Sequence, residues 1–178
     1  ARVVGLSLDP VSTPSFYGAA SLVDKIDGHH VDVRDTAKTV ETIRTIEPDF
    51  IFHLAAQALV KKSVDNPIDT FTTNALGSIN ILESARQLQR NLVIVMVTSD
   101  KVYKNFEWVW GYREVDQLGG MDPYSASKGM AEFGIQSYVK TFFVSEENRI
   151  KVGIARAGNV IGGGDWSKDR LIPDCIKA

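Results

Sequence analysis

Apolar segments of strand length alternate with longer amphipathic segments along most of this chain. Residues 49–56, 91–98 and 151–157 are rich in Val, Ile, Phe and Ala, which predicts buried strands. Residues 67–88 have the apolar spacing of a helix, and so has the segment that begins at Tyr124. Strands that alternate with helices form parallel sheets, with right-handed crossovers and helices on both faces. The sequence therefore predicts a doubly wound α/β fold.

The two ends of the chain predict further elements of the same kind. The first 30 residues predict a strand over residues 3–8, a loop over 12–21 and a turn over 27–30. A short strand that ends near Asp32 is predicted next, followed by a helix from Asp35 or Thr36 to about Ile46. The glycine-rich residues 158–166 predict either a flexible turn or backbone that approaches a ligand closely. Residues 170–178 predict the start of a helix. No domain boundary is evident within the chain.

The composition is that of one soluble globular domain. The chain has 178 residues, 44% of them hydrophobic, and its 20 basic and 22 acidic residues give a net charge of −2. The charges are well mixed, which argues against a nucleic-acid groove and against binding to an anionic membrane surface. The longest apolar run, residues 92–97, is much shorter than the roughly 20 residues of a membrane helix.

The cysteine and histidine positions predict neither a disulfide nor a metal site. Cys175 is the only cysteine, so no disulfide can form within the chain, and the expected compartment is the reducing cytoplasm. His29, His30 and His53 share no metal-ligand spacing with one another or with Cys175. They are expected to be turn and core residues.

Tyr124 and Lys128 form a Tyr-x-x-x-Lys pair in a predicted helix, where a spacing of four puts both on one face. A lysine ammonium lowers the pKa of a nearby phenol, so the phenolate can act as a base near neutral pH. This pair indicates redox chemistry at a sugar or alcohol carbon. The alternative is a plain helix start, with Asp122 or Ser125 as the N-cap and Pro123 at the first position.

A second cluster of reactive residues follows the strand of residues 91–98. This strand ends in Thr98-Ser99-Asp100-Lys101, and open parallel sheets bind ligands at the carboxyl ends of their strands. The sequence therefore predicts that Asp100 and Lys101 lie at the same edge as the Tyr-x-x-x-Lys helix, in a catalytic site. In the alternative interpretation, Asp100 and Lys101 form a surface ion pair.

Together these segments resemble the extended short-chain dehydrogenase/reductase family, and within it the nucleotide-sugar 4,6-dehydratases. The resemblance covers the whole chain and is carried by residues 98–103, 108–114, 122–128, 156–166 and 170–174. Within the family, these segments most resemble the dehydratases of CDP-glucose; the relatives that act on thymidine-diphosphate sugars have glutamate where Lys101 stands. The resemblance implies a Rossmann fold that binds NAD, a nucleotide-sugar substrate and a role in deoxysugar or O-antigen synthesis.

The resemblance also assigns binding residues. Positions that resemble the family's cofactor site are Asp32, Val33, Leu54, Ala55, Ala56, Gln57, Asn74, Thr98, Tyr124, Lys128 and Ala157. Asn159 and Arg170 resemble positions near the sugar and the nucleotide diphosphate. No arginine follows Leu8-Asp9 to hold a 2′-phosphate, which favours NAD over NADP.

The chain departs from the family at its beginning, because no G-x-x-G-x-x-G loop is present to hold a pyrophosphate. We therefore expect it to be a piece of a longer protein, a partial cofactor-binding Rossmann domain over residues 1–178 with the start of the substrate domain near 159–178. Relatives are commonly dimers through two helices, which implies a homodimer at full length.

In the reaction that the resemblance implies, Tyr124 takes the proton of the sugar 4-hydroxyl as hydride leaves C4, and Ser99 bonds the same oxygen. Lys101 then removes the C5 proton, Asp100 protonates the departing 6-hydroxyl, and hydride returns at C6. One physical difficulty is that an aspartate beside a lysine lowers its own pKa and raises the lysine's, so desolvation by substrate must offset this.

Two other functions fit parts of the sequence. A UDP-N-acetylglucosamine 4,6-dehydratase also uses an Asp-Lys pair, but it usually continues with Ala where Val102-Tyr103 stand and has Gly-Ala-Thr between its tyrosine and lysine. A non-catalytic Rossmann-like module would explain the absent glycine loop. The presence of Asp100, Lys101 and the Tyr-x-x-x-Lys pair argues against such a module.

Overall fold

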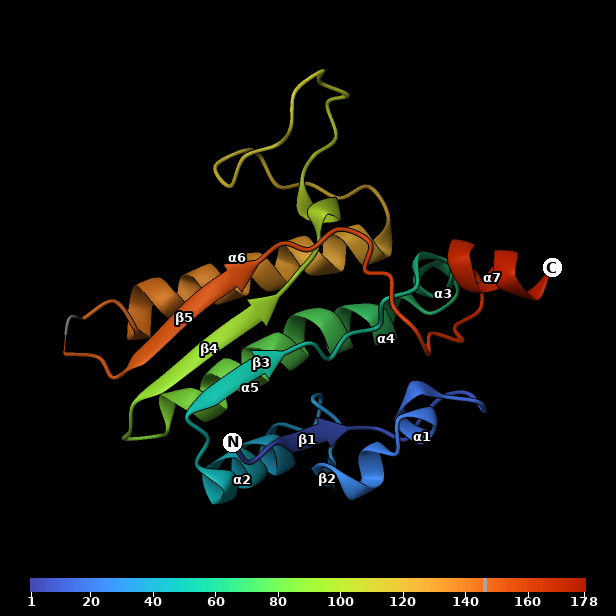
Figure 1. Ribbon diagram of the computed structural model, residues 1–178. Helices are drawn as coiled ribbons and strands as arrows, with labels where there is room; N and C mark the ends of the chain where they lie inside the picture. The colour runs from blue at the N-terminus through green and yellow to red at the C-terminus, as the bar shows by residue number, and fades with distance from the viewer. Residues whose placement is uncertain (146) are drawn as a thin grey trace. The chain divides into compact units, whose positions relative to one another are not determined.

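The computed structural model describes residues 1–145 and 147–178, which form two compact units (Figure 1). One unit contains residues 33–158, and the other combines residues 1–32 with residues 159–178. Each unit contains a parallel sheet, and each described strand pair is parallel. The predicted α/β class with parallel strands is thus confirmed.

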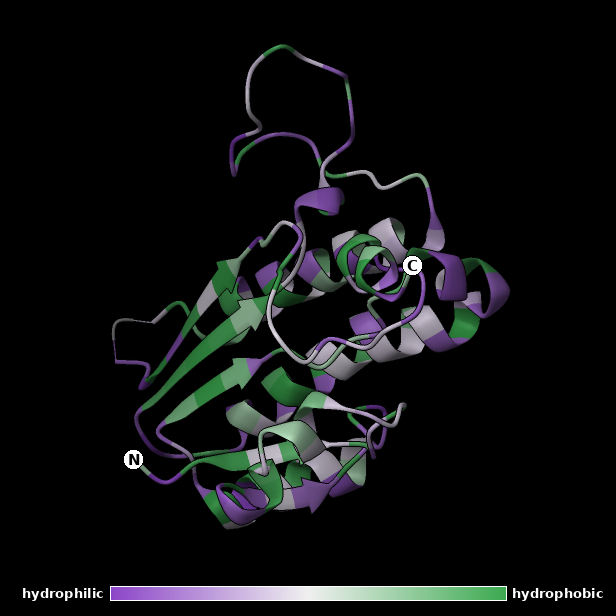
Figure 2. Cartoon of the chain, turned by 45° about the vertical axis from the view of Figure 1, so that its right-hand side comes forward, coloured by the Kyte–Doolittle hydropathy of each residue, from purple (hydrophilic) through white to green (hydrophobic). Residues whose placement is uncertain are grey.

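The larger unit contains a three-stranded sheet in the order β3-β4-β5, formed by β3 (Phe50–His53), β4 (Leu92–Val97) and β5 (Ile150–Ala155). β3 and β4 lie within the segments that the sequence predicts, and β5 begins one residue before its predicted segment. Figure 2 colours β4 and β5 mostly green, because Val, Ile, Leu and Ala fill them. Strands that are apolar on both faces are typical of parallel sheets.

The described residues of this unit form the α-helices α2 (Thr36–Ile46), α3 (Val60–Asp65), α4 (Pro67–Phe71), α5 (Gly77–Arg86) and α6 (Pro123–Phe142). The predicted helix over residues 67–88 is present as α4 and α5, joined without a break by one π-helical segment, Thr72–Leu76. The α3 helix lies outside the predicted elements. It lacks a side-chain N-cap, so its start has no local sequence signal.

Helices α5 and α6 lie along one face of the three-stranded sheet (Figure 1). Leu92, Ile94 and Met96 point toward that face and are at most 1% exposed, whereas Phe50 and Phe52 are 63% exposed. Over residues 33–145 and 147–158, the expected helices on both faces of the sheet are therefore not found. The physical reason is that three strands in sequential order with right-handed crossovers put both connecting helices on the same side.

An aromatic-rich loop, residues 104–117, separates β4 from α6. Its base is closed by an isolated antiparallel bridge between Tyr103 and Leu118, with a hydrogen bond from the Lys104 amide to the Gln117 carbonyl (2.8 Å). Within the loop, the rings of Phe106 and Trp108 stack with centroids 4.8 Å apart. Residues 104–117 thus form a loop that projects from the carboxyl edge of the sheet and is closed at its base. We call it the tryptophan loop.

The smaller unit contains β1 (Val4–Ser7), α1 (Phe16–Ala19), β2 (Asp27–His30) and α7 (Leu171–Lys177). The strand near residues 3–8 and the helix start near residue 170 are confirmed. The predicted turn over residues 27–30 is wrong, because these residues pair in parallel with β1 from Val4↔Asp27 to Ser7↔His30. Pairing with a neighbouring strand overrides the turn preference of Asp-Gly.

The predicted loop over residues 12–21 contains the short helix α1. The Ser15 hydroxyl accepts a hydrogen bond from the Gly18 amide (3.2 Å), which caps the first turn. None of the described helices is both long enough and apolar enough to cross a membrane.

Candidate active site

The start of α6 fixes the position of the Tyr-x-x-x-Lys pair. Asp122 is the N-cap and Pro123 the first helical residue, as the sequence predicts, and the Asp122 carboxylate accepts a hydrogen bond from the Ser125 amide (3.0 Å). Gly120 passes so close to this first turn that an added Cβ would lie 2.3 Å from the Ser125 Cβ. Only glycine therefore lets the preceding loop cross the helix start.

Tyr124 and Lys128 lie one turn apart on the buried face of α6, 9% and 7% exposed. The Lys128 ammonium donates a long hydrogen bond (3.4 Å) to the carbonyl of Val97, the last residue of β4. Burial lowers the pKa of Lys128 from 10.5 to about 8. A buried ammonium with one long contact in the described structure has donors left for another partner, which suits a ribose hydroxyl and the Tyr124 oxygen.

Residues 98–101 directly follow β4 and carry the second predicted cluster. The Ser99 hydroxyl caps a short 3₁₀ helix, Asp100–Val102, by accepting from the Lys101 amide (3.2 Å), and it donates to the Asp100 carboxylate (3.1 Å). The Asp100 amide donates to the carbonyl of Ala157, just beyond β5 (3.0 Å). Asp100 and Lys101 are exposed, and the ion pairs of the described residues do not include one between them.

The geometry therefore brings the two predicted clusters together. Lys128 contacts the carbonyl of Val97, and the next four residues along the chain are Thr98, Ser99, Asp100 and Lys101. All of these lie where β4 ends, at the carboxyl edge of the sheet, which is the ligand-binding edge in open α/β sheets.

Asn74 connects the turn after β3 to helix α6. Its side-chain carbonyl accepts from the Gln57 amide (2.8 Å), and its amide group donates to the Gln57 carbonyl (3.0 Å) and to the Ser127 hydroxyl (2.9 Å). Asn74 is 1% exposed. It holds the predicted cofactor residues around Gln57 against the segment between Tyr124 and Lys128.

Gln57 itself completes this network. Its side chain accepts from the Leu59 amide (2.7 Å) and donates to the Leu59 carbonyl (3.0 Å) and the Thr70 hydroxyl (2.9 Å). The side chains of both Asn74 and Gln57 are thus used within the protein. A contact from either residue to a cofactor stays a prediction.

His53, the last residue of β3, is a core residue, as the sequence predicts, and is 5% exposed. Its Nε2 lies 3.0 Å from the Ser78 hydroxyl, which donates its proton to the Asn74 carbonyl (2.7 Å). His53 must therefore donate to Ser78, which makes it the Nε2–H tautomer. Burial, with a smaller contribution from the charge of Lys128, lowers the pKa of His53 from 6.5 to about 4.

This shift predicts an acid-sensitive fold. Between pH 6.5 and 4 the unfolded chain binds a proton at residue 53 that the folded chain excludes, so the free energy of unfolding falls as the pH drops through this window. By pH 4.5 the loss reaches roughly 2 to 3 kcal/mol. Urea unfolding at pH 7.5 and 4.5 measures it. The variant His53→Gln, whose amide can still donate to Ser78, should lose that part of the pH dependence; an unchanged dependence would contradict the assignment.

The other predicted cofactor residues lie in different surroundings. Leu54 is 70% exposed, and Ala55, Ala56 and Ala157 are half-buried. The Val33 side chain is buried, and its carbonyl accepts from the Asn80 amide group (2.8 Å). Asp32, Asn159 and Arg170 belong to the smaller unit, so their roles at the site stay predictions.

Some residues that organise the site were missed by the sequence analysis. The Ser63 hydroxyl accepts from the Tyr124 amide (3.1 Å), and Glu132, which is 0% exposed, accepts from the Thr98 hydroxyl (2.7 Å). The position of Glu132 could have been predicted from the sequence. It follows Lys128 by four residues and therefore lies on the same face of the helix. Ser63 had none, since its contact with α6 spans 61 residues of sequence.

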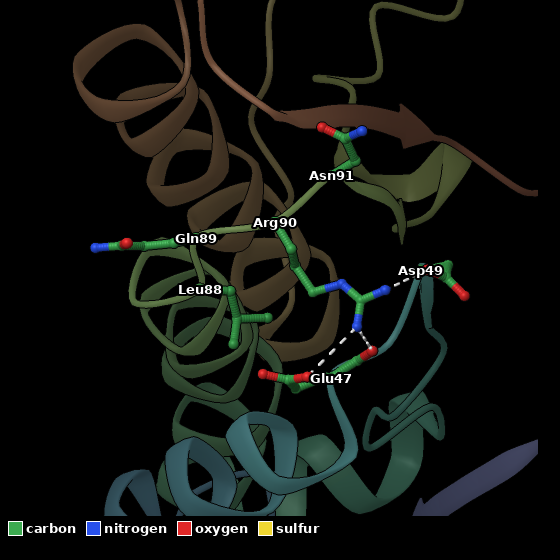
Figure 3. A pocket seen from close by; sticks show the side chains of 6 residues that line it. All are labelled: Glu47, Asp49, Leu88, Gln89, Arg90 and Asn91. Atoms are coloured by element: carbon green, nitrogen blue, oxygen red, sulfur yellow. Dashed lines mark hydrogen bonds and ion pairs between the residues drawn. The ribbon is translucent and has the colours of Figure 1, made fainter.

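Two cavities in the described part of the chain lie away from these proposed site residues. One, of about 400 Å³, lies beside the amino ends of β3 and β4, where Arg90 bonds the Glu47 carbonyl and the Asp49 carboxylate (Figure 3). The other, of about 300 Å³, lies in the tryptophan loop and is lined by Trp108, Trp110, Arg113 and Asp116. Over residues 1–145 and 147–178, no group of three or more His, Cys, Asp or Glu side chains is arranged to hold a metal ion.

Comparisons with known proteins agree with this geometry. The family model of GDP-mannose 4,6-dehydratase matches residues 15–150. A CDP-glucose 4,6-dehydratase of Salmonella typhimurium is 44% identical over 100% of this chain and 50% of its own length. A CDP-paratose 2-epimerase of Salmonella typhi is 33% identical over 64% of this chain and 38% of its own length.

Solved structures give the same result for the fold. A UDP-glucose 4-epimerase of Thermus thermophilus, in complex with NAD, matches with a TM-score of 0.75 and 27% identity, over 92% of this chain and 50% of that one. A dTDP-glucose 4,6-dehydratase of Streptomyces venezuelae, with NAD bound, matches with a TM-score of 0.82 and 23% identity, over 99% of this chain and 52% of that one. The latter likeness supports the fold alone.

The fold and the paired motifs are those of a Rossmann-type domain of the short-chain dehydrogenase/reductase class. Within it, the chain belongs to the GDP-mannose 4,6-dehydratase family. The chain spans about half the length of the curated relatives it matches.

Proposed function

We propose that this chain carries the cofactor-binding and catalytic part of a CDP-glucose 4,6-dehydratase, which converts CDP-glucose to CDP-4-keto-6-deoxyglucose. One observation carries the proposal: the buried Tyr-x-x-x-Lys helix bonds, through Lys128, to the strand end that bears Ser99, Asp100 and Lys101. The relative that is 44% identical over the whole chain has this activity, which supports CDP-glucose as the substrate.

The residues at the carboxyl edge fit an NAD cofactor. The Lys128 ammonium has hydrogen-bond donors left for a ribose hydroxyl. Ala55 and Ala56 are half-buried and offer a cofactor backbone groups and small side chains. NAD, when bound, accepts a hydride from the substrate and gives it back. The UDP-glucose 4-epimerase structure that matches this chain at 27% identity contains NAD, which supports the choice of cofactor.

The chain's own residues supply the proton transfers. Tyr124 takes the proton of the sugar 4-hydroxyl, and Ser99 hydrogen-bonds the same oxygen. The 4-ketone acidifies C5, so Lys101 can remove the C5 proton while Asp100 protonates the departing 6-hydroxyl. Asp100 and Lys101 are exposed, and the ion pairs of the described residues do not include one between them. Bound substrate can therefore lie between the two side chains and remove water from both.

We propose substrate-binding roles for two residues of the smaller unit, Arg170 and Asn159. Among the described residues, the Arg170 Nε is buried with no hydrogen-bond partner, which suits a diphosphate oxygen. Asn159 is exposed and can bond a sugar hydroxyl. We also propose that the enzyme is cytoplasmic, is a homodimer at the length of its relatives, and acts in deoxysugar or O-antigen synthesis.

A direct assay tests this proposal. A version extended to the length of the relatives is incubated with NAD and, separately, with CDP-glucose, dTDP-glucose, UDP-N-acetylglucosamine and GDP-mannose. Release of water and a 4-keto product, detected by mass spectrometry as a loss of 18 mass units, is expected with CDP-glucose at the highest kcat/KM. A product of unchanged mass with inverted C4 would instead support an epimerase, and no product with any sugar would support the non-catalytic module.

A further inference from the structure

Glu132 and Arg156 form a buried ion pair next to the proposed active site. Glu132 lies on α6 and is 0% exposed, and Arg156 directly follows β5. The Arg156 Nε donates to both Glu132 oxygens (2.8 and 3.0 Å), and its Nη2 donates to Oε2 (2.5 Å). The Glu132 carboxylate holds the pKa of Arg156 well above its usual range. Arg156 therefore stays charged throughout the physiological pH range, and its contact with the Glu132 carboxylate is bidentate.

Stability alone does not explain this pair. Moving two charges out of water costs free energy that their attraction only partly returns, and apolar residues of similar volume often replace buried pairs without loss of stability. A further role must then come from what the two side chains hold in place. Each of them has one or more partners beyond the pair.

Glu132 also holds the end of β4. Its Oε1 accepts a hydrogen bond from the Thr98 hydroxyl (2.7 Å), and Thr98 is the residue before Ser99. Tyr124, Lys128 and Glu132 are spaced by four residues and are all buried, so they form one stripe along α6. Lys128 bonds the Val97 carbonyl and Glu132 bonds the Thr98 hydroxyl. Two consecutive residues of the strand end are thus fixed from the helix that bears the catalytic tyrosine.

Arg156 extends the same connection to the tryptophan loop. Its guanidinium lies 4.6 Å from the centroid of the Tyr103 ring, and its Nη1 donates to the Glu114 carbonyl (3.2 Å). The Tyr103 ring stacks on Tyr112 at 5.1 Å, within the loop. The ion pair therefore touches three segments: the strand end with Ser99 and Asp100, the catalytic helix, and the base of the tryptophan loop.

We propose that Glu132 and Arg156 are positioning residues. They set how far the strand end that bears Ser99 and Asp100 lies from Tyr124 on α6. The inference rests on the proposed dehydratase function. Neither residue transfers a proton in the proposed mechanism. They act through the Thr98 hydroxyl, and they fix the tryptophan loop through Tyr103. Misplacement of a catalytic group by about 1 Å can cost about 100-fold in rate, so the loss of this connection should appear in kcat.

The test compares two double variants in a protein of the relatives' length. Glu132→Met with Arg156→Met removes both charges and the acceptor for Thr98, whereas Glu132→Gln with Arg156→Met removes both charges but keeps a carbonyl oxygen for Thr98. We expect kcat with CDP-glucose to fall about 10- to 100-fold in the first, with KM changed less than about threefold. The second should regain at least about threefold of that loss.

A matched control removes another arginine–carboxylate pair far from these residues. Arg90 and Asp49 pair at the amino edge of the same sheet (Figure 3), and Arg90→Met with Asp49→Met should leave kcat within about twofold of the unchanged protein. If Glu132→Met with Arg156→Met lowers the melting temperature but leaves the kcat of the folded enzyme unchanged, the pair is structural only and the inference fails. Equal kcat in the two double variants would also overturn it.

Thr98 gives a test that does not depend on the folding of the double variants. Thr98→Val keeps the side-chain shape and removes only the hydroxyl that donates to Glu132, and Thr98→Ser keeps the hydroxyl. Thr98→Ser is expected to have at least about ten times the kcat of Thr98→Val, and equal values would overturn the inference. Absence of dehydratase activity in the unchanged protein is a separate result, since it removes the proposed function itself.

Discussion

Tyr124→Phe is expected to lower kcat with CDP-glucose by about 100-fold or more while the protein stays folded. In the proposed mechanism, the substitution removes the hydroxyl that takes the proton of the sugar 4-hydroxyl. It keeps the ring, which is 9% exposed, and the backbone amide that donates to Ser63. The side chain at this position therefore stays packed in the core. We expect kcat to fall and the stability of the fold to stay unchanged.

The measurement is steady-state formation of the 4-keto product, together with a thermal unfolding scan of each protein. Tyr138→Phe is the matched control, because it makes the same chemical change 14 residues further along α6. That control should keep its activity. Full activity in Tyr124→Phe would remove Tyr124 from the mechanism. A parallel loss in Tyr138→Phe would mean that any hydroxyl on this helix matters and that the assignment is not specific.

Asp100→Asn is expected to separate oxidation of the sugar from loss of water. Asn cannot protonate the departing 6-hydroxyl, so formation of the 4-keto-6-deoxy product should fall by about 100-fold or more. In the proposed mechanism, removal of hydride from C4 depends on Tyr124 and Lys128, which the substitution leaves intact. The Asp100 amide also keeps its bond to the Ala157 carbonyl, so the backbone of the strand end should not move.

Stopped-flow absorbance in the reduced-nicotinamide band follows the first step, and the product assay follows the second. We expect the absorbance to rise to nearly one equivalent per active site and to persist, with little product. Asp65→Asn, at the exposed end of α3, is the control and should show neither effect. Normal product formation in Asp100→Asn would discard Asp100 as the acid. Loss of both signals would place its action earlier, in substrate binding or in the first hydride step.

Local sequence signals predicted the elements that position the proposed chemistry. The β4 strand and helix α6 lie where the apolar pattern and the Asp122-Pro123 start place them, because caps and buried strands depend on neighbouring residues. The errors arose where a distant partner decides the conformation. Residues 27–30 form a strand only because β1 pairs with them, and α3 has no side-chain cap that could announce it.

For the site, the sequence by itself determined which chemical groups are present and which of them share a face. Spacings of four residues put Tyr124 and Lys128 on one side of a helix, and the end of a parallel strand puts residues 98–101 at the ligand edge. Only the tertiary structure decided how these groups are held and tuned. Burial lowers the pKa of Lys128 to about 8, and Asn74 and Glu132 bond segments that lie 53 and 34 residues away. Desolvation and long-range hydrogen bonds depend on which surfaces meet after folding, and no local pattern in the sequence specifies that meeting.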